Sequence, residues 1–133
     1  MAVDPRSLLP RHKCDDEHAD ATIALGYPAV APVLPDLLEW LQDCNWPISH
    51  AIAPFLVSIG EPVFPYVREV FQGTDGCWKY WCIDQFVRKL PRDVAEGLRA
   101  DLQRLAYHPT NDDHDQEVEE QAREALIWLD GTG

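Results

Sequence analysis

The sequence is short of basic residues and of long apolar runs, and each shortage excludes a class of protein. It has 11 Lys and Arg residues against 23 Asp and Glu residues, which gives a net charge of −12. A surface that binds DNA or RNA needs clustered Lys and Arg to neutralise phosphates, so we expect no nucleic-acid partner. No apolar run approaches the roughly 18–20 residues that span a bilayer, so we expect no membrane segment.

Export signals and catalytic motifs are also missing. The first ten residues lack the apolar core of a secretory signal, which predicts a cytoplasmic protein. The four cysteines, at positions 14, 44, 77 and 82, are therefore interpreted as reduced thiols. There is no glycine-rich phosphate loop, G-x-S-x-G motif or H-E-x-x-H motif. An enzyme, such as an uncharacterised hydrolase, is thus the least favoured of three functional classes.

The nearest approach to a metal-binding pattern is formed by His12, Cys14 and His18. These three residues supply candidate ligands within seven positions. The paired spacing and the fourth ligand that are typical of zinc sites are missing. We therefore predict neither a metal nor another cofactor.

The negative charge is concentrated towards the two ends of the sequence. Residues 1–43 carry 3 basic and 8 acidic residues, residues 44–92 carry 5 and 4, and residues 93–133 carry 3 and 11. Such an acidic surface favours a basic protein partner. Solubility alone is the competing explanation of the charge.

Apolar residues recur at helical spacing along most of the chain, and no stretch alternates like a strand. We predict about seven helices after an irregular lead-in at 1–14, with Asn45, Asp75 and Asp93 as N-caps of three of them. The predicted helices cover residues 16–25, 32–42, 46–59, 62–72, 77–90, 94–105 and 113–129.

Two blocks of the sequence resemble each other. Pro35 aligns with Pro65 at an offset of 30 residues, and 43–46 aligns with 75–78 at an offset of 32. A period in this range is typical of helix-pair repeats. The sequence therefore predicts an all-α fold, an α/α superhelix of HEAT-like helix pairs, in a single domain covering residues 1–133.

Three motifs carry a resemblance to a known family. Residues 37–47 read L-L-E-W-L-Q-D-C-N-W-P, residues 59–62 read I-G-E-P, and residues 78–81 read W-K-Y-W. They resemble a family of small bacterial domains of unknown function with the pattern L-L-x-W-L-x-D-x-N-W-P, I-G-x-P and W-K-Y-W, over about residues 8–128. The resemblance implies a HEAT-like helical fold and brings no catalytic residue. Some such domains are similar to immunity proteins encoded beside secreted toxins.

Tryptophans flanked by carboxylates are the best candidates for a binding surface, because exposed Trp is enriched in interface hot spots. Helix capping by Asp43 and Asp75 and core packing by the tryptophans are the competing interpretations. The candidate partner-binding residues are Glu39, Asp43, Asn45, Trp46, Asp75, Lys79 and Trp81.

These observations favour a non-catalytic protein-binding domain. The first hypothesis is an immunity protein that occludes a basic toxin domain acting in the cytosol. The alternative is a helical scaffold or adaptor whose acidic surface serves solubility. The oligomeric state is left open.

Overall fold

The computed structural model describes residues 3–131 and confirms the all-α class. Nine α-helices and six 3-10 turns make up this part of the chain, and it contains no strand. The α-helices are α1 (Asp16–Leu25), α2 (Leu34–Leu38), α3 (Ser49–Ile59), α4 (Phe64–Gln72), α5 (Gly76–Gln85), α6 (Arg92–Ala95), α7 (Arg99–Tyr107), α8 (Asn111–Asp115) and α9 (Val118–Asp130). The 3-10 turns are η1 (Pro5–Leu8), η2 (Ala31–Val33), η3 (Glu39–Leu41), η4 (Glu61–Val63), η5 (Val87–Lys89) and η6 (Glu96–Leu98).

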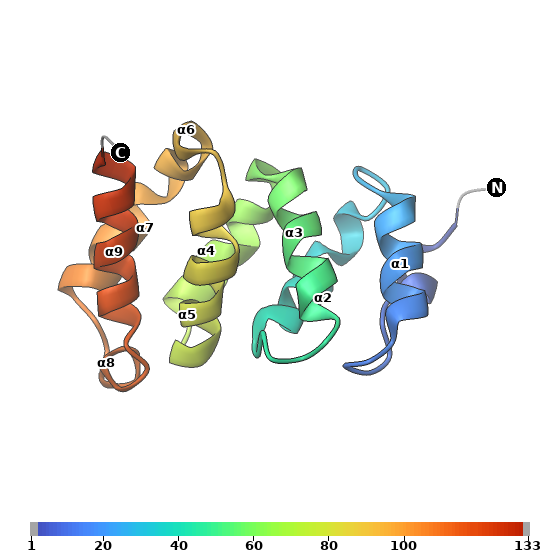
Figure 1. Cartoon of the computed structure of the whole chain (residues 1–133), viewed down its shortest axis with the longest axis horizontal. Coiled ribbons are helices and arrows are strands. Elements are labelled where there is room, and N and C mark those ends of the chain that lie inside the picture. Colours follow the sequence, from blue (N-terminus) through green and yellow to red (C-terminus); the bar gives the residue numbers. More distant parts are fainter. Residues whose placement is uncertain (1–2, 132–133) are drawn as a thin grey trace.

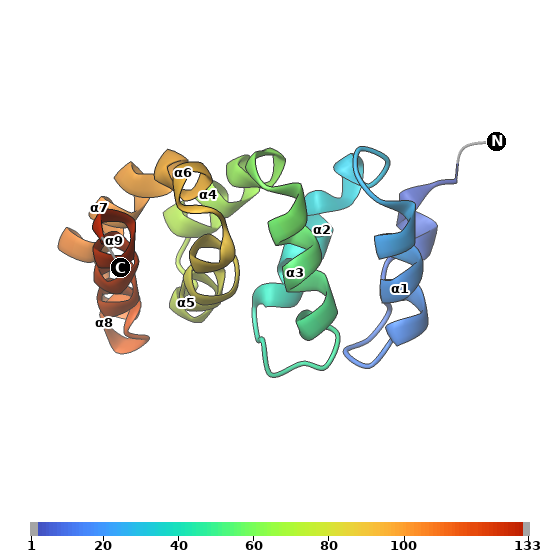
Figure 2. The same cartoon turned by 45° about the horizontal axis from the view of Figure 1, so that its top comes forward.

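The helices stand in a row from the N-terminal to the C-terminal end of the molecule (Figures 1 and 2). Contacts between neighbours define hairpins: α2 packs on α3, α4 on α5, and α7 on α9. Helices α2, α4 and α7 also contact one another in sequence, as do α1 with α3 and α5 with α9. Stacked hairpins of this kind are what a helix-pair repeat predicts. The superhelical, HEAT-like arrangement stays a prediction.

The structure shows a third copy of the repeat in addition to the two that the sequence revealed. Each of α2, α4 and α7 follows directly on a 3-10 turn, η2, η4 or η6. The equivalent side chains in the three copies are all fully buried: Val33, Val63 and Leu98, then Leu37, Val67 and Leu102, then Leu41, Phe71 and Ala106. Each copy therefore buries one equivalent side chain per helical turn along its first helix.

A single hydrophobic cluster runs through the described residues from Ala19 in α1 to Leu129 in α9. It holds the hairpins together, because all the α-helices except α8 contribute buried apolar side chains to it. The prediction that residues 1–14 are irregular is wrong in part. Pro5–Leu8 form η1, with the Asp4 carboxylate accepting a hydrogen bond from the Arg6 N–H. Residues 1 and 2 of that lead-in lie outside the described residues.

The predicted helix at 32–42 is a short α-helix between two 3-10 turns. The carbonyl of Leu38 accepts the indole N–H of Trp78, and the carbonyl of Trp40 accepts the hydroxyl of Ser49. The Gln42 N–H, which would bond to Leu38 in an α-helix, donates to Glu39 instead. Side chains from α3 and α5 therefore take over the carbonyls that would continue the α-helix.

Two predicted N-caps, Asn45 and Asp93, are wrong. Helix α3 begins at Ser49, because the Trp46 N–H bonds to the Asp43 carbonyl and forms a separate turn. Helix α6 begins at Arg92, directly after Pro91, whose side chain makes no cap bond. The prediction for Asp75 is confirmed, since its carboxylate accepts the Trp78 N–H at 3.1 Å and caps α5.

The predicted helices at 77–90, 94–105 and 113–129 are each interrupted. Helix α5 ends at Gln85 and gives way to η5, and η6 separates α6 from α7. Glu117, with a left-handed φ of 62°, separates α8 from α9. The N–H groups of residues 116 and 117 bond back to carbonyls within α8 and close it off. The division of the last two predicted helices gives nine α-helices in the described residues, where about seven were expected.

Candidate functional site

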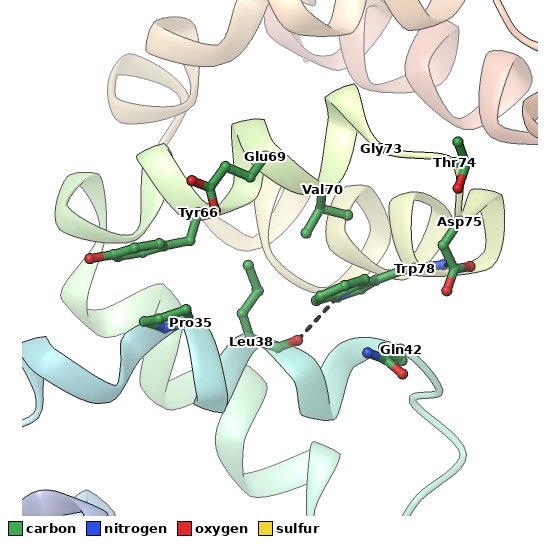
Figure 3. A pocket seen from close by; sticks show the side chains of 10 residues that line it. All are labelled: Pro35, Leu38, Gln42, Tyr66, Glu69, Val70, Gly73, Thr74, Asp75 and Trp78. Carbon is green, nitrogen blue, oxygen red and sulfur yellow. Dashed lines mark hydrogen bonds between the residues drawn. The ribbon is translucent and has the colours of Figure 1, made fainter.

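The surface has a groove where the first two repeats meet, which we name groove A. It has a volume of about 350 Å³ and lies between α2 with η3 on one side and α4 with the start of α5 on the other. Figure 3 shows its lining. The ten lining residues are Pro35, Leu38, Gln42, Tyr66, Glu69, Val70, Gly73, Thr74, Asp75 and Trp78.

The floor of groove A is apolar and is fixed by the packing of the repeats. Leu38 and Val70 are 1% and 6% exposed and belong to the core. The Trp78 ring lies beside them, and its indole N–H donates to the Leu38 carbonyl at 3.1 Å (Figure 3). Because Asp75 caps the first turn of α5, the position of Trp78 at the floor follows from the local fold. The floor is therefore pre-formed.

Polar groups are placed on the rim of groove A. Pro35 and Tyr66 lie together at one end, whereas Gln42, Thr74 and Asp75 lie at the other, beyond Trp78 (Figure 3). The exposed Glu69 stands on the α4 side. The two charged lining residues, Glu69 and Asp75, are both acidic. The groove thus runs from an apolar end formed by Pro35 and Tyr66, where Glu69 stands on the rim, to an end that carries the Asp75 carboxylate (Figure 3).

A second groove, which we name groove B, lies on the N-terminal side of α2 and η3. It also has a volume of about 350 Å³, and its lining is Leu9, Pro10, Asp36, Glu39, Trp40, Gln42 and Trp46. The rings of Trp40 and Trp46 meet edge to face with centroids 5.6 Å apart. The charged residues of this lining are again acidic. Gln42 lines both grooves, so α2 and η3 form a ridge between them.

The structure separates the candidate residues that the sequence suggested. Glu39 and Trp46 line groove B, and Asp75 lines groove A. Asp43 and Asn45 lie in the loop between η3 and α3 and line neither groove; the Asp43 carboxylate accepts the Asn45 N–H at 2.9 Å. Trp81 is partly buried, packs edge to face on Tyr80, and lines a separate hollow beside α8.

Lys79 is the candidate that the structure contradicts, because its side chain is fully buried. Its ammonium donates to the carboxylate of Asp113 at 2.7 Å, and both side chains are 0% exposed. Asp113 belongs to the capping box of α8, where it accepts the Thr110 N–H at 3.0 Å. Lys79 therefore fastens α8 to α5 and is not available to a partner.

The charge of the buried pair is balanced within the protein. Burial alone raises the pKa of Asp113, but the hydrogen bond and charge of Lys79 and the Thr110 N–H outweigh it, so the pKa is lowered. A neighbouring contact strengthens the junction: the Gly76 N–H donates to the carboxylate of Asp112 at 2.6 Å. The acidic start of α8 thus holds the N-terminal turn of α5, next to groove A.

Sequence reasoning missed several residues of groove A, among them Leu38, Tyr66, Glu69 and Trp78. Glu69 is the repeat equivalent of Glu39, which lines groove B, so the repeat alignment contained a signal for it. The others were interpreted as core or left unassigned, because a groove floor has the same apolar character as a core.

The histidines and cysteines show no convergent metal chemistry. His18 Nδ1 lies 3.0 Å from the Asp15 carboxylate, and His12 Nδ1 accepts the Cys14 N–H. Within residues 3–131, no three His, Cys, Asp or Glu side chains are grouped to hold a metal ion. All four cysteines are free thiols, and burial raises the pKa of Cys44 to about 12.

Stacked helical hairpins and two acidic grooves define the class: an all-α repeat protein with a preformed surface site. The chain belongs to the family described as "Domain of unknown function (DUF5071)", whose model matches residues 8–126. A comparison with curated proteins found no match. Among the helices of residues 3–131, none combines the length and the apolar character needed to cross a bilayer.

Proposed function

We propose that this protein is a non-catalytic binding domain that recognises a basic surface of another protein. The observation that supports the proposal is the composition of the two grooves. Each offers apolar and aromatic side chains, and the charged residues of both linings are all acidic: Asp36, Glu39, Glu69 and Asp75. Apolar anchors beside charges of one sign are the composition of a specific interface with a partner of the opposite charge.

These carboxylates are available to a partner. All four are exposed, and within the described residues none of them takes part in an ion pair. The net charge of −12 adds a long-range attraction for a basic protein. Such attraction mainly raises the association rate and selects among partners.

An immunity protein is the biological role that fits this binding mode best. The ridge of α2 and η3, with a groove on each side, would enter the basic cleft of a toxin domain and block access to it. Carboxylates would meet the cleft's Lys and Arg, and the aromatic groove walls would bury apolar side chains at its margin. A bacterial cytosol is the proposed location of this encounter.

The alternative, a helical scaffold, is favoured by a different surface. Tyr107 in α7 and Ile127 in α9 are 62% and 70% exposed on the last hairpin. The guanidinium of Arg123, one helical turn before Ile127, lies over the Tyr107 ring. A scaffold would use this end of the row to dock a neighbouring protein, independently of grooves A and B.

The test begins with capture of the partner by the wild-type protein from the source cell, followed by kinetics with the purified pair. Glu39→Lys/Glu69→Lys reverses one carboxylate beside each groove, and Glu17→Lys/Asp20→Lys makes the same charge change on exposed α1 positions outside both grooves. We expect the groove variant to slow association at least about tenfold more than the α1 variant at low salt. Equal rate constants for the two variants would refute the proposal.

Reversal of Asp75 is less suitable than reversal of Glu69, because the Asp75 carboxylate also caps α5. The immunity role has its own readout: co-expression with the captured protein should restore growth of cells that the captured protein harms. Full rescue by the Glu39→Lys/Glu69→Lys variant would show that neutralisation does not use grooves A and B, and absence of rescue by the wild type would argue for the scaffold alternative.

A further inference from the structure

We infer that groove A binds an extended segment of the partner in which an apolar side chain and a Lys or Arg side chain point to the same side. This assignment rests on the proposed function and adds to it the chemistry of the recognised segment. It follows from the order of side chains along groove A, from the apolar end at Pro35 and Tyr66 to the carboxylate end at Asp75 (Figure 3).

The apolar end is suited to one aliphatic side chain. Pro35 and Tyr66 are partly buried walls above the buried Leu38 and Val70, so a side chain placed there contacts carbon on several sides. The side chains of Pro35, Leu38 and Val70 have no polar atom. The Tyr66 hydroxyl points out of the groove in Figure 3, so a side chain bound at this end need not form a hydrogen bond with it. An aliphatic side chain would therefore gain burial without leaving a polar group unpaired.

The carboxylate end is suited to a cation. The Asp75 carboxylate accepts the Trp78 N–H through Oδ1, and the residue is exposed. The amide of Gln42 adds a further acceptor at this end, whereas the Glu69 carboxylate stands on the rim near Tyr66, at the opposite end (Figure 3). A guanidinium or ammonium could contact a carboxylate while its aliphatic stem covers the indole.

An extended segment is the backbone form that matches this order. Successive side chains of an extended chain point to opposite sides, so residues i and i+2 face the same surface about 6.6 Å apart. The peptide Ac-Leu-Gly-Arg-NH2 places Leu and Arg in this way and is the probe for the test. Ac-Leu-Gly-Glu-NH2 reverses the charge, and Ac-Gly-Gly-Arg-NH2 removes the apolar side chain.

The Trp78 indole N–H is a reporter inside the groove, because its hydrogen bond to Leu38 forms the floor. In proton–nitrogen correlation spectra of the ¹⁵N-labelled full chain, we expect Ac-Leu-Gly-Arg-NH2 to shift the Trp78 indole signal saturably. The indole signals of Trp40 and Trp46, which line groove B, serve as internal controls. Both control peptides should bind at least about fivefold more weakly.

Two conservative variants test the carboxylates without disturbing the fold. Glu69→Gln keeps an exposed polar side chain, and Asp75→Asn keeps an oxygen that can cap α5. Together they should weaken the binding of Ac-Leu-Gly-Arg-NH2 about fivefold and leave the binding of Ac-Leu-Gly-Glu-NH2 no weaker than before. Spectra of the free variants that match the wild type away from groove A would show that the fold is retained.

Two outcomes would overturn the inference. One is a Trp78 signal that responds equally to the Arg and Glu peptides, or to neither. The other is a captured partner protein that shifts the Trp46 signal and leaves Trp78 unmoved. The second outcome would still support the proposed function, since binding would then occur through groove B, so the two failures can be told apart.

Discussion

Replacement of Lys79 by methionine tests whether the buried ion pair holds α8 against α5. Methionine has nearly the same length and volume as lysine but no charge, so the change removes one partner and leaves the other. The Asp113 carboxylate, 0% exposed, would keep the Thr110 N–H as a donor and lose the ammonium at 2.7 Å. Removal of one member of a buried pair costs about 3–5 kcal/mol. Because Thr110 still donates, we expect the lower part of that range, about 3 kcal/mol.

The measurement is the free energy of unfolding from urea denaturation, followed by far-ultraviolet circular dichroism at neutral pH. Lys89→Met is the matched control: the same chemical change at an exposed lysine of η5 should alter stability by no more than about 0.5 kcal/mol. In Lys79→Met/Asp113→Asn no unpaired charge remains, so part of the loss should be recovered. Equal effects of Lys79→Met and Lys89→Met would refute the reasoning.

The pH dependence of the Lys79→Met effect has a defined sign. In the wild-type protein the pKa of Asp113 is lowered from 3.8, so the contribution of the pair is present above that value and is lost as the pH falls through the folded-state pKa. Without Lys79, burial dominates and the carboxyl is more stable when protonated. The stability difference between wild type and Lys79→Met should therefore narrow in acid.

Three further predictions concern other contacts. The pKa of Asp15 is lowered from 3.8 to about 2, chiefly by the Arg11 N–H, so the contribution of its carboxylate to stability is lost as the pH falls between these values. The variant Asp15→Asn can still cap α1, and its free energy of unfolding should depend less on pH in this window of acid-unfolding curves. Gly76→Ala would place a methyl group 2.8 Å from the carbonyl oxygen of Asp112 and should lower stability by about 1–3 kcal/mol in urea unfolding. In the native protein only the exposed Cys14 should react rapidly with a thiol reagent, and Cys14→Ser should abolish the fast phase.

The sequence predicted those features of the fold that depend on neighbours in the chain. The spacing of Val63, Val67 and Phe71 indicated a helix, and Asp75 before an apolar helix start indicated its cap. Helix ends were predicted less well where a distant side chain takes a backbone carbonyl. The Trp78 indole, for example, bonds to Leu38, 40 residues earlier in the sequence.

The role of Lys79 could not be predicted from local pattern. A lysine between Trp78 and Tyr80 has the charge expected of a surface residue, and Asp113 lies 34 positions further on, among other acidic residues. Only the stacking of α8 beside α5 brings the two together.

The third repeat could not be recognised in the sequence because it departs from the pattern of the first two. Its first helix begins 35 residues after Phe64, where the previous spacing is 30, and it lacks the proline that the other two share.

In groove A the buried floor residues stabilise the fold, and the exposed rim residues are the ones available to select a partner. Leu38 and Val70 stack the first two repeats and form the floor at the same time, so their replacement would alter stability and binding together. Glu69 stands on the exposed rim, where a charge contributes little to stability, whereas Asp75 on the same rim also caps α5. Conservative changes on the rim should therefore alter recognition at nearly constant unfolding free energy. In the proposed immunity role, this arrangement would let the rim residues change with the charges of the partner while the floor, which the fold requires, stays the same.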